Sequence, residues 1–389
     1  MLRVAVNATP LLSPLTGIGN YIAELGRALA ATGEVDLHSF YGFRWRHETP
    51  QPPPRGARGP AAQSLRDAIK PFVPFKRELR GAQQQLMFAR GLRRHAIDLY
   101  HEPNYVPIRF DVPVVTTVHD LSWLRYPDAH PIDRVRWLEK GLPRALEQSA
   151  AILVDSEFVR QEVLTTFGID PQRVTVAHLG VGAQFRPRSR EETNAVLRPL
   201  ALVHGSYLLT VGTIEPRKNL AHALEAYALL PPALRERFPL VVAGAKGWRS
   251  GAMEVKLRQL ADCGQIRFLG HVPGGDLPAL YAGAAAFVFP SLYEGFGLPP
   301  LEAMASGVPV LVSDRASLPE VVGEAGVTLD PERPERTAEL IVALMGDAGE
   351  RTRLGGAVVE RARGFTWEAC AKLTLAVYSR AGAFAEPGG

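Results

Sequence analysis

The most informative part of this chain is the stretch Pro290-Ser-Leu-Tyr-Glu-Gly-Phe-Gly-Leu-Pro-Pro-Leu-Glu-Ala-Met-Ala-Ser-Gly307. An apolar run at 284–289 precedes it and a second apolar run at 308–312 follows it, and both are typical of buried strands. Pro299 and Pro300 suit the first turn of a helix, because their missing amide donors would be unpaired there anyway. Gly307 is placed to end that helix. The stretch therefore predicts a strand, a glycine turn, a short helix and a second strand.

The helix of this unit points its N-terminus out of the carboxyl edge of the predicted sheet. Such an end offers free amide donors and a partial positive charge, which suit an anionic phosphate. Glu294 lies in the turn before the helix, and Glu302 lies on the helix itself. Because neither acid belongs to the apolar pattern, both are candidate site residues.

The same residues carry a resemblance to a known family. Glu294 and Glu302 form a Glu-x7-Glu pair, which alone is unspecific because two acids at this spacing occur by chance in many proteins. In its full setting the pair resembles the retaining, nucleotide-sugar-dependent glycosyltransferases of the GT-B fold that are often called GT4. That setting consists of Gly295, Phe296, Gly297, Pro299 and the Gly307-Val-Pro-Val tail. The resemblance covers nearly the whole chain and is strongest over 212–314.

Composition and strand–helix alternation set the expected architecture. A chain of 389 residues with 46% hydrophobic and 22% charged residues is too long for one compact core. The alternation predicts an α/β protein with two Rossmann-like domains facing across a cleft. We expect an acceptor-side domain at 1–190, a nucleotide-sugar-binding domain at 200–365, and a helix and tail at 366–389. The polar, proline-flanked stretch 186–199 is typical of a linker, and the resemblance implies that the last helix crosses back to the first domain.

Cysteine content and hydropathy bear on the compartment. Two cysteines, Cys263 and Cys370, fit a reducing environment. The first residues turn polar too quickly for a signal peptide, and no apolar run approaches the ~20 residues that cross a bilayer. We expect a cytoplasmic protein, with peripheral attachment to the inner face of the cytoplasmic membrane as an option.

In the first domain, glycines and a histidine are candidates. From Gly17 and Gly19 alone a plain strand–helix turn is the more frequent interpretation, but the resemblance implies a loop near the donor phosphate and the acceptor. His119 and Asp120 end a strand, where ligands gather in open α/β sheets. A lone histidine is more often a structural hydrogen-bonding group, yet the resemblance implies that His119 contacts the donor sugar. Asp120 either orients His119 or faces the acceptor, and Tyr105 lines the acceptor side.

In the second domain, a basic pair follows a strand and precedes a helix. Arg217 and Lys218, with helix amides, would offset a diphosphate leaving group that carries about two negative charges. A solvated basic turn is the alternative, but Glu215-Pro-Arg-Lys-Asn219 resembles the diphosphate-binding signature of the family. The resemblance also places the nucleotide beside four backbone positions at strand ends, which are Gly212, Gly244, His271 and Val272.

The resemblance gives the acids their roles. Glu294 holds hydroxyls of the donor sugar together with the amides of Phe296 and Gly297, with Gly295 and Leu298 in the same set. Glu302 accepts hydrogen bonds from the ribose. The competing interpretation is a glycosidase-like carboxylate pair with Glu294 as nucleophile. Further along, Ser317 is expected to cap the next helix, with Glu320 completing a capping box.

The expected reaction is transfer of a hexose, with retention, to a hydroxyl of a lipid-linked or oligosaccharide acceptor in surface polysaccharide synthesis. Mannose or rhamnose from a GDP-sugar is favoured by resemblance to bacterial mannosyl- and rhamnosyltransferases, and a UDP-sugar-dependent transferase or a sugar-nucleotide epimerase is the alternative. We expect no cofactor and no metal, since the chain has no Asp-x-Asp motif. The Thr16-Gly-Ile-Gly-Asn-Tyr21 turn also lacks the third glycine of a dinucleotide fingerprint.

The segment 65–95 is unusually basic and is predicted to be helical. Its cations lie beside apolar residues such as Phe72 and Leu86, which fits contact with an anionic membrane. A solvated helix pair with one face in the core explains the pattern equally well. Nucleic acid is not an expected partner, because no recognition motif accompanies the charge.

Overall fold

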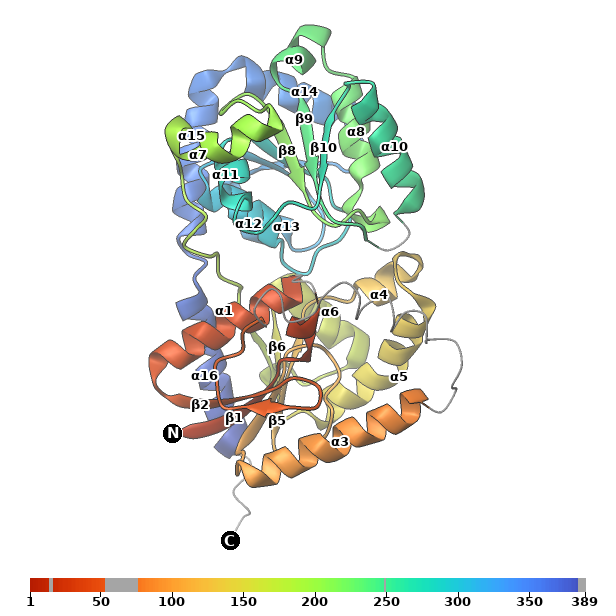
Figure 1. Cartoon of the computed structure of the whole chain (residues 1–389), viewed down its shortest axis with the longest axis vertical. Coiled ribbons are helices and arrows are strands. Elements are labelled where there is room, and N and C mark those ends of the chain that lie inside the picture. Colours follow the sequence, from red (N-terminus) through yellow and green to blue (C-terminus); the bar gives the residue numbers. More distant parts are fainter. Residues whose placement is uncertain (14–16, 53–75, 248–249, 384–389) are drawn as a thin grey trace.

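The computed structural model describes residues 1–13, 17–52, 76–247 and 250–383. Two halves are stacked along the long axis of the molecule, and each contains a twisted sheet flanked by helices (Figure 1). The predicted α/β architecture with two Rossmann-like units is confirmed. The boundaries proposed for the domains, 1–190 and 200–365, stay predictions.

The sheet of the first half has the strand order β3-β2-β1-β4-β5-β6-β7. Its strands are parallel except β3, which runs antiparallel to β2 at the edge. The central strands are buried along their whole length, as a sheet covered on both faces requires. The strands are β1 (Leu2–Asn7), β2 (Val35–Phe40), β3 (Trp45–Arg46), β4 (Leu99–Glu102), β5 (Val114–Val118), β6 (Ala151–Val154) and β7 (Val174–Val176).

Helices cover both faces of this sheet. Leu25 and Leu29 of one helix pack with Leu37 of β2, whereas Phe88 of another helix packs with Phe40 on the opposite face of β2. The helices of this half are α1 (Gly17–Thr32), α3 (Lys76–Arg94), α4 (Ser122–Arg125), α5 (Ile132–Gln148) and α6 (Glu157–Phe167). Ser156 caps α6 by accepting a hydrogen bond from the Val159 amide at 3.2 Å.

The sheet of the second half has the order β10-β9-β8-β11-β12-β13 and is parallel throughout its described strands. These are β8 (Leu208–Val211), β9 (Leu240–Ala243), β10 (Arg267–Gly270), β11 (Ala286–Phe289), β12 (Val310–Ser313) and β13 (Val327–Leu329). The helices are α7 (Arg190–Leu197), α8 (Leu220–Ala228), α9 (Pro232–Arg237), α10 (Gly251–Asp262), α11 (Leu277–Ala282), α12 (Leu298–Ala305), α13 (Leu318–Val322), α14 (Pro334–Gly346) and α15 (Ala348–Ala362).

The unit predicted from 290–307 forms as expected. Strand β11 leads into the glycine turn, helix α12 begins at Leu298, and β12 pairs in parallel with β11. Pro299 and Pro300 occupy the first turn of α12. Gly307 follows the helix with a φ of 80°, in the left-handed region that glycine adopts without strain.

The segment 186–199, which is predicted to be a linker, contains a helix. Residues 190–197 form α7, which packs against α11 of the second half. Ser189 and Glu192 make a reciprocal capping box at its start. This capping-box spacing is the local signal in the sequence for the helix, and the boundary between the two domains stays a prediction.

The last helix, α16 (Trp367–Ala383), crosses back to the first half, as predicted, and packs along α1 (Figure 1). The Tyr378 hydroxyl of α16 lies 2.7 Å from Nδ1 of His101 on β4. One continuous apolar cluster joins the two halves, because Phe365, Trp367 and Val377 are part of the same core as β1 and β12.

Part of the basic segment 65–95 lies outside the described residues, namely 65–75. Residues 76–94 form α3, which confirms the helix prediction there. Leu86 and Met87 are exposed on α3, while Phe88 is buried. Over the described ranges, we find no helix with the length and apolar character that crossing a bilayer demands.

Candidate active site

The glycine turn before α12 lies directly against the first half of the molecule. A Cβ added to Gly295 would lie 1.8 Å from the backbone oxygen of His119 and 2.9 Å from Cβ of Asp120. The Ser156 hydroxyl donates a hydrogen bond of 2.7 Å to the Gly295 carbonyl. Only a glycine allows this approach, so the carboxyl edges of the two sheets meet at Gly295.

Three of the predicted catalytic residues are brought together beside this contact. Arg217 and Lys218 come from a 3-10 turn after β8, and Glu294 comes from the glycine turn after β11. The Lys218 Nζ lies 2.5 Å from Glu294 Oε1, and an Arg217 Nη lies 3.2 Å from Oε2. The Ser291 hydroxyl adds a 2.7 Å hydrogen bond to Oε1. Each oxygen of this carboxylate is therefore held by a cation.

The charges of Glu294, Lys218 and Arg217 are paired in a buried environment, where an unpaired charge is costly. Glu294 is only 6% exposed. Burial alone would raise the pKa of Glu294, but Lys218 and Arg217 outweigh it and hold that pKa below its usual value. Burial also lowers the pKa of Lys218, against the attraction of Glu294. Glu294 is therefore ionised near neutral pH, and its removal would leave two buried cations without their anion.

The turn that carries Glu294 is fixed by a serine hydroxyl. Ser317 does not cap its own helix by its side chain, so that prediction is wrong. Instead its Oγ lies 2.9 Å from the Glu294 carbonyl and 2.8 Å from the Phe296 carbonyl. Gly297 has a φ of 112°, and a Cβ there would lie 2.8 Å from the Leu318 side chain. These constraints hold the backbone that leads from Glu294 into α12.

The side chain and the backbone amide of Phe296 have different environments. The ring is buried and packs edge-on against Phe365, with ring centroids 5.7 Å apart. It therefore belongs to the core. What remains for a ligand is the backbone amide, together with those of Gly297 and Leu298 at the start of α12, where amide groups have no partner within the helix.

His119 is held firmly within the first half. Its Nε2 lies 2.8 Å from the Pro103 carbonyl and its Nδ1 lies 2.7 Å from Asp155 Oδ2. Burial acts to lower the pKa of His119, but Asp155 outweighs it, so the pKa is raised. Of the two roles considered for Asp120, the orienting one belongs to Asp155. Asp155 directly follows β6, and this place at the carboxyl end of a strand is the sequence signal that could have identified it.

Asp120 faces the second half instead. It accepts hydrogen bonds from the Tyr105 hydroxyl at 3.0 Å and from the Ser122 hydroxyl at 2.8 Å. Burial would raise its pKa, but the Arg217 guanidinium across the boundary and these hydrogen bonds lower it. The structure therefore brings Asp120, Tyr105 and Arg217 into one electrostatic environment.

Glu302 lies on α12, one turn beyond the amides. Burial raises its pKa to about 7. The other predicted nucleotide-side positions follow strands of the same sheet. Gly212 and Gly244 lie so close that a Cβ on Gly244 would be 1.8 Å from the Gly212 oxygen, and the exposed His271 and partly buried Val272 follow β10.

The glycines at the start of α1 lie in the first half. Gly17 is exposed, and a Cβ there would have no neighbour within 4 Å. Gly19, in the same first turn of the helix, is buried. Packing does not require a glycine at 17, and its predicted role beside a ligand stays a prediction.

Two further residues, Tyr293 and Glu320, connect the two halves. From the sequence, Tyr293 was missed and Glu320 was assigned to the wrong helix. The Tyr293 hydroxyl accepts from the Leu121 amide at 2.9 Å and donates to Glu162. Glu320 does not form a capping box in its own helix. It accepts from the Glu157 and Phe158 amides at 2.8 and 3.2 Å, so it caps α6 of the other half, and it also pairs with His178.

The fold and the residues at the junction of the two halves together identify the class of enzyme. Two Rossmann-like units meet at their carboxyl edges, and a helix N-terminus, two cations and a buried carboxylate gather at the junction, which is the layout of a GT-B glycosyltransferase. The model "Glycosyl transferases group 1" matches residues 202–360, and "Glycosyltransferase Family 4" matches residues 15–185.

Comparison with individual proteins places the chain within that class. The O-antigen chain mannosyltransferase B of Escherichia coli is 37% identical over 379 residues, which cover 97% of this chain and 99% of that protein. The chain therefore belongs to the group 1 and family 4 glycosyltransferases and is a transferase enzyme, which confirms the resemblance stated from the sequence.

Solved structures share the fold at lower identity. The sucrose-phosphate synthase of Thermosynechococcus elongatus has a TM-score of 0.77 at 21% identity, over 99% of this chain and 100% of that chain. WaaG, a glycosyltransferase involved in lipopolysaccharide biosynthesis, has a TM-score of 0.69 at 18% identity, over 99% and 100%. The similarity to these structures covers 99% of this chain and supports the GT-B fold along its length.

Proposed function

We propose that this enzyme transfers a hexose, with mannose or rhamnose favoured, from a nucleotide diphosphate sugar to a hydroxyl of a lipid-linked or oligosaccharide acceptor in surface polysaccharide synthesis. The name of the Escherichia coli relative, an O-antigen chain mannosyltransferase, supports the sugar and the product class. The observation that carries the proposal is the Arg217–Glu294–Lys218 cluster, placed opposite Asp120 at the junction of the two halves.

In this proposal the donor diphosphate lies against Arg217, Lys218 and the first amides of α12. These groups supply positive potential where negative charge develops as the diphosphate leaves. Both cations are mostly shielded from water, with side chains 14% and 13% exposed, so their interaction with a phosphate is weakly screened. Glu302, farther along α12, accepts hydrogen bonds from the ribose.

An exchange of partners at Glu294 follows from this placement. The diphosphate takes Arg217 and Lys218 as its own counter-ions, and this frees the Glu294 oxygens to accept hydrogen bonds from hydroxyls of the donor sugar. Ser291 keeps the carboxylate in place through the exchange. Diphosphate binding and sugar binding are therefore coupled through one carboxylate.

The transfer itself is proposed to proceed with retention. The bond from the anomeric carbon to the diphosphate oxygen breaks, and the bond to the acceptor oxygen forms on the same face. The acceptor proton passes to an oxygen of the departing phosphate. The glycosidase-like alternative, with Glu294 as nucleophile, is less well supported because both of its oxygens are paired with cations.

The acceptor is proposed to approach from the first half. Asp120 follows β5 and Tyr105 follows β4, and the ionised Asp120 is able to accept a hydrogen bond from an acceptor hydroxyl. For a lipid-linked acceptor, α3 offers membrane contact, since Leu86 and Met87 are exposed close in sequence to the exposed Arg90, Arg93 and Arg94. Sedimentation with anionic and neutral vesicles would test that contact.

A donor panel tests the proposed function. We expect GDP-mannose or GDP-rhamnose to raise the melting temperature more than UDP-glucose, and the same donor to support transfer to a lipid-linked saccharide. Nuclear magnetic resonance of the product should show the anomeric configuration of the donor. Conversion of the donor to another sugar without any acceptor would instead support the epimerase alternative and contradict transfer.

A further inference from the structure

A cluster of histidines and one aspartate lies on the edge hairpin of the first sheet, away from the junction. Asp36 and His38 alternate along β2, so their side chains lie on one face of the strand. Ser39 pairs with Arg46 across the hairpin, and one step further in this antiparallel register brings His47 opposite His38. The local fold therefore gathers the three side chains.

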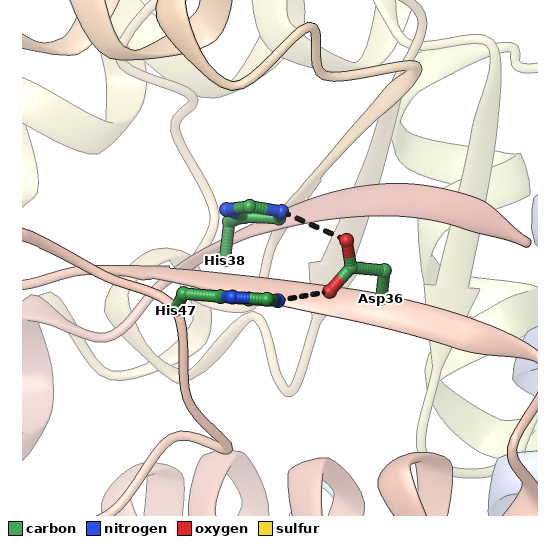
Figure 2. Close-up of side chains that lie close together, drawn as sticks. All are labelled: Asp36, His38 and His47. Atoms are coloured by element: carbon green, nitrogen blue, oxygen red, sulfur yellow. Dashed lines mark hydrogen bonds and ion pairs between the residues drawn. The ribbon is translucent and has the colours of Figure 1, made fainter.

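The three side chains converge through atoms that can bind a metal. The Asp36 carboxylate lies beside the edges of the two imidazole rings and contacts one nitrogen of each (Figure 2), with Oδ2 3.2 Å from His38 Nε2 and Oδ1 hydrogen-bonded to His47 Nε2. The rings are stacked, with centroids 4.6 Å apart and planes 10° from parallel. One ligand atom from each residue lies within 4.8 Å of the other two.

The hydrogen bonding of His38 differs from that of two other buried histidines. In His101 and His119 both ring nitrogens have protein partners. His38 is only 6% exposed, yet its Nδ1 has no hydrogen-bond partner among the described residues. The nitrogen of His38 that faces the Asp36 carboxylate is Nε2, and this is the atom that would bind an ion.

We propose that Asp36, His38 and His47 bind a divalent transition-metal ion of the zinc class, through one carboxylate oxygen and the two Nε2 atoms. Imidazole and carboxylate ligands bind zinc at about 2.0–2.2 Å, which sets neighbouring donors about 3.3 Å apart in a tetrahedron. The observed spacing needs only side-chain adjustment to reach this. Water completes the coordination, and by the usual order of affinity copper binds this set more tightly than zinc.

The location gives the ion a structural role. Asp36 lies near the amino end of β2, whereas the donor cluster lies at the carboxyl ends of the strands. An ion here ties β2 to the residue that follows β3, at the open edge of the sheet. The alternative is that the His38–Asp36–His47 stack braces the hairpin without any ion, and the experiment distinguishes the two.

The test is a zinc titration of the full chain after removal of metals with a chelator. We expect calorimetry to show one zinc ion per chain and a rise in melting temperature. His47→Gln and Asp36→Asn should weaken binding by at least about tenfold. The His47 side chain is 66% exposed, so its replacement should leave the fold intact. The matched controls are His204→Gln and Asp262→Asn, at a partly buried histidine and an exposed aspartate of the second half.

A second readout uses cobalt in place of zinc. We expect the d–d absorption of protein-bound cobalt in the wild type and in both controls, and its loss in His47→Gln. If wild type, controls and His47→Gln bind zinc equally, or if none shows the cobalt band, the proposal is overturned and the cluster is a hairpin brace.

Discussion

Glu294 is a buried carboxylate whose two oxygens are held by Arg217 and Lys218. Because the same cations are proposed to hold the diphosphate, Glu294 has one set of partners in the free enzyme and another with donor bound. Its amide analogue keeps the shape but loses the charge. Replacement at this one position should therefore affect turnover and stability together.

We predict that Glu294→Gln lowers kcat by about 10- to 100-fold, since a hydrogen bond to a charged group contributes about 1.5–3 kcal/mol. The melting temperature should also fall, because two buried cations lose their anion. Steady-state release of nucleoside diphosphate measures the first effect. Glu225→Gln on the exposed face of α8 is the control. Near-normal turnover in Glu294→Gln would exclude this carboxylate from the site.

A second prediction concerns Glu302, whose pKa burial raises to about 7. The folded state is favoured while this carboxyl is protonated, and that stability is lost as pH rises through about 7. Donor binding has the opposite pH dependence, because the ionised Glu302 carboxylate accepts hydrogen bonds from the ribose hydroxyls better than the protonated form does. The KM for the donor should therefore rise as pH falls from about 8 to about 6. Identical KM profiles for wild type and Glu302→Gln would contradict this role.

How far single residues could be predicted from the sequence depends on whether their partners are local. Glu294, Arg217 and Lys218 come from compact motifs, and the structure brings all three together. Asp155 was missed because Asp-Ser-Glu before a helix has an adequate local explanation as a cap. Its contact with His119 joins the ends of two neighbouring strands, which a linear pattern does not show.

Helix α13 contributes a carboxylate to the N-terminus of α6 in the other half. Glu320 accepts from the first two amides of α6 and from His178. A capping residue normally belongs to the helix it caps, which is why the sequence interpretation assigned Glu320 to α13. In this fold a helix end is instead completed only when the halves are together.

We predict that Glu320→Gln lowers the melting temperature near pH 7, with a cap contribution of about 1 kcal/mol. Burial opposes ionisation of Glu320, but His178 and the α6 amides lower its pKa below the ordinary 4.5. The stabilisation by ionised Glu320 is therefore fully present above pH 4.5, and it is lost as the pH falls through the lower pKa of Glu320 in the folded protein. The difference in melting temperature between wild type and variant should narrow below pH 4.5; a constant difference would contradict this account.

The two halves are joined by a shared core, by α16 and by the contact at Gly295. The parallel sheets and the 290–307 unit were predictable, because apolar strand runs and helix punctuation are local signals. The contacts that set how the halves meet were not. Tyr293 and Glu162 are 131 positions apart in sequence, and their pairing follows from the assembled fold.

We predict that Gly295→Ala lowers kcat/KM by at least about tenfold, since a small displacement between catalytic groups has effects of this size or larger. The added methyl would lie 1.8 Å from the His119 oxygen, so the halves must move apart. Small-angle scattering should show a larger radius of gyration. Gly274→Ala, where a Cβ has no neighbour within 4 Å, is the control and should match the wild type.

The most direct measurement is a crystal structure of this enzyme with an intact nucleotide sugar. The account predicts that the diphosphate lies at the junction, within hydrogen-bond distance of Arg217, Lys218 and the first amides of α12, with sugar hydroxyls on Glu294. A donor bound elsewhere, or a diphosphate held through a divalent ion with Arg217 and Lys218 still paired to Glu294, would contradict it.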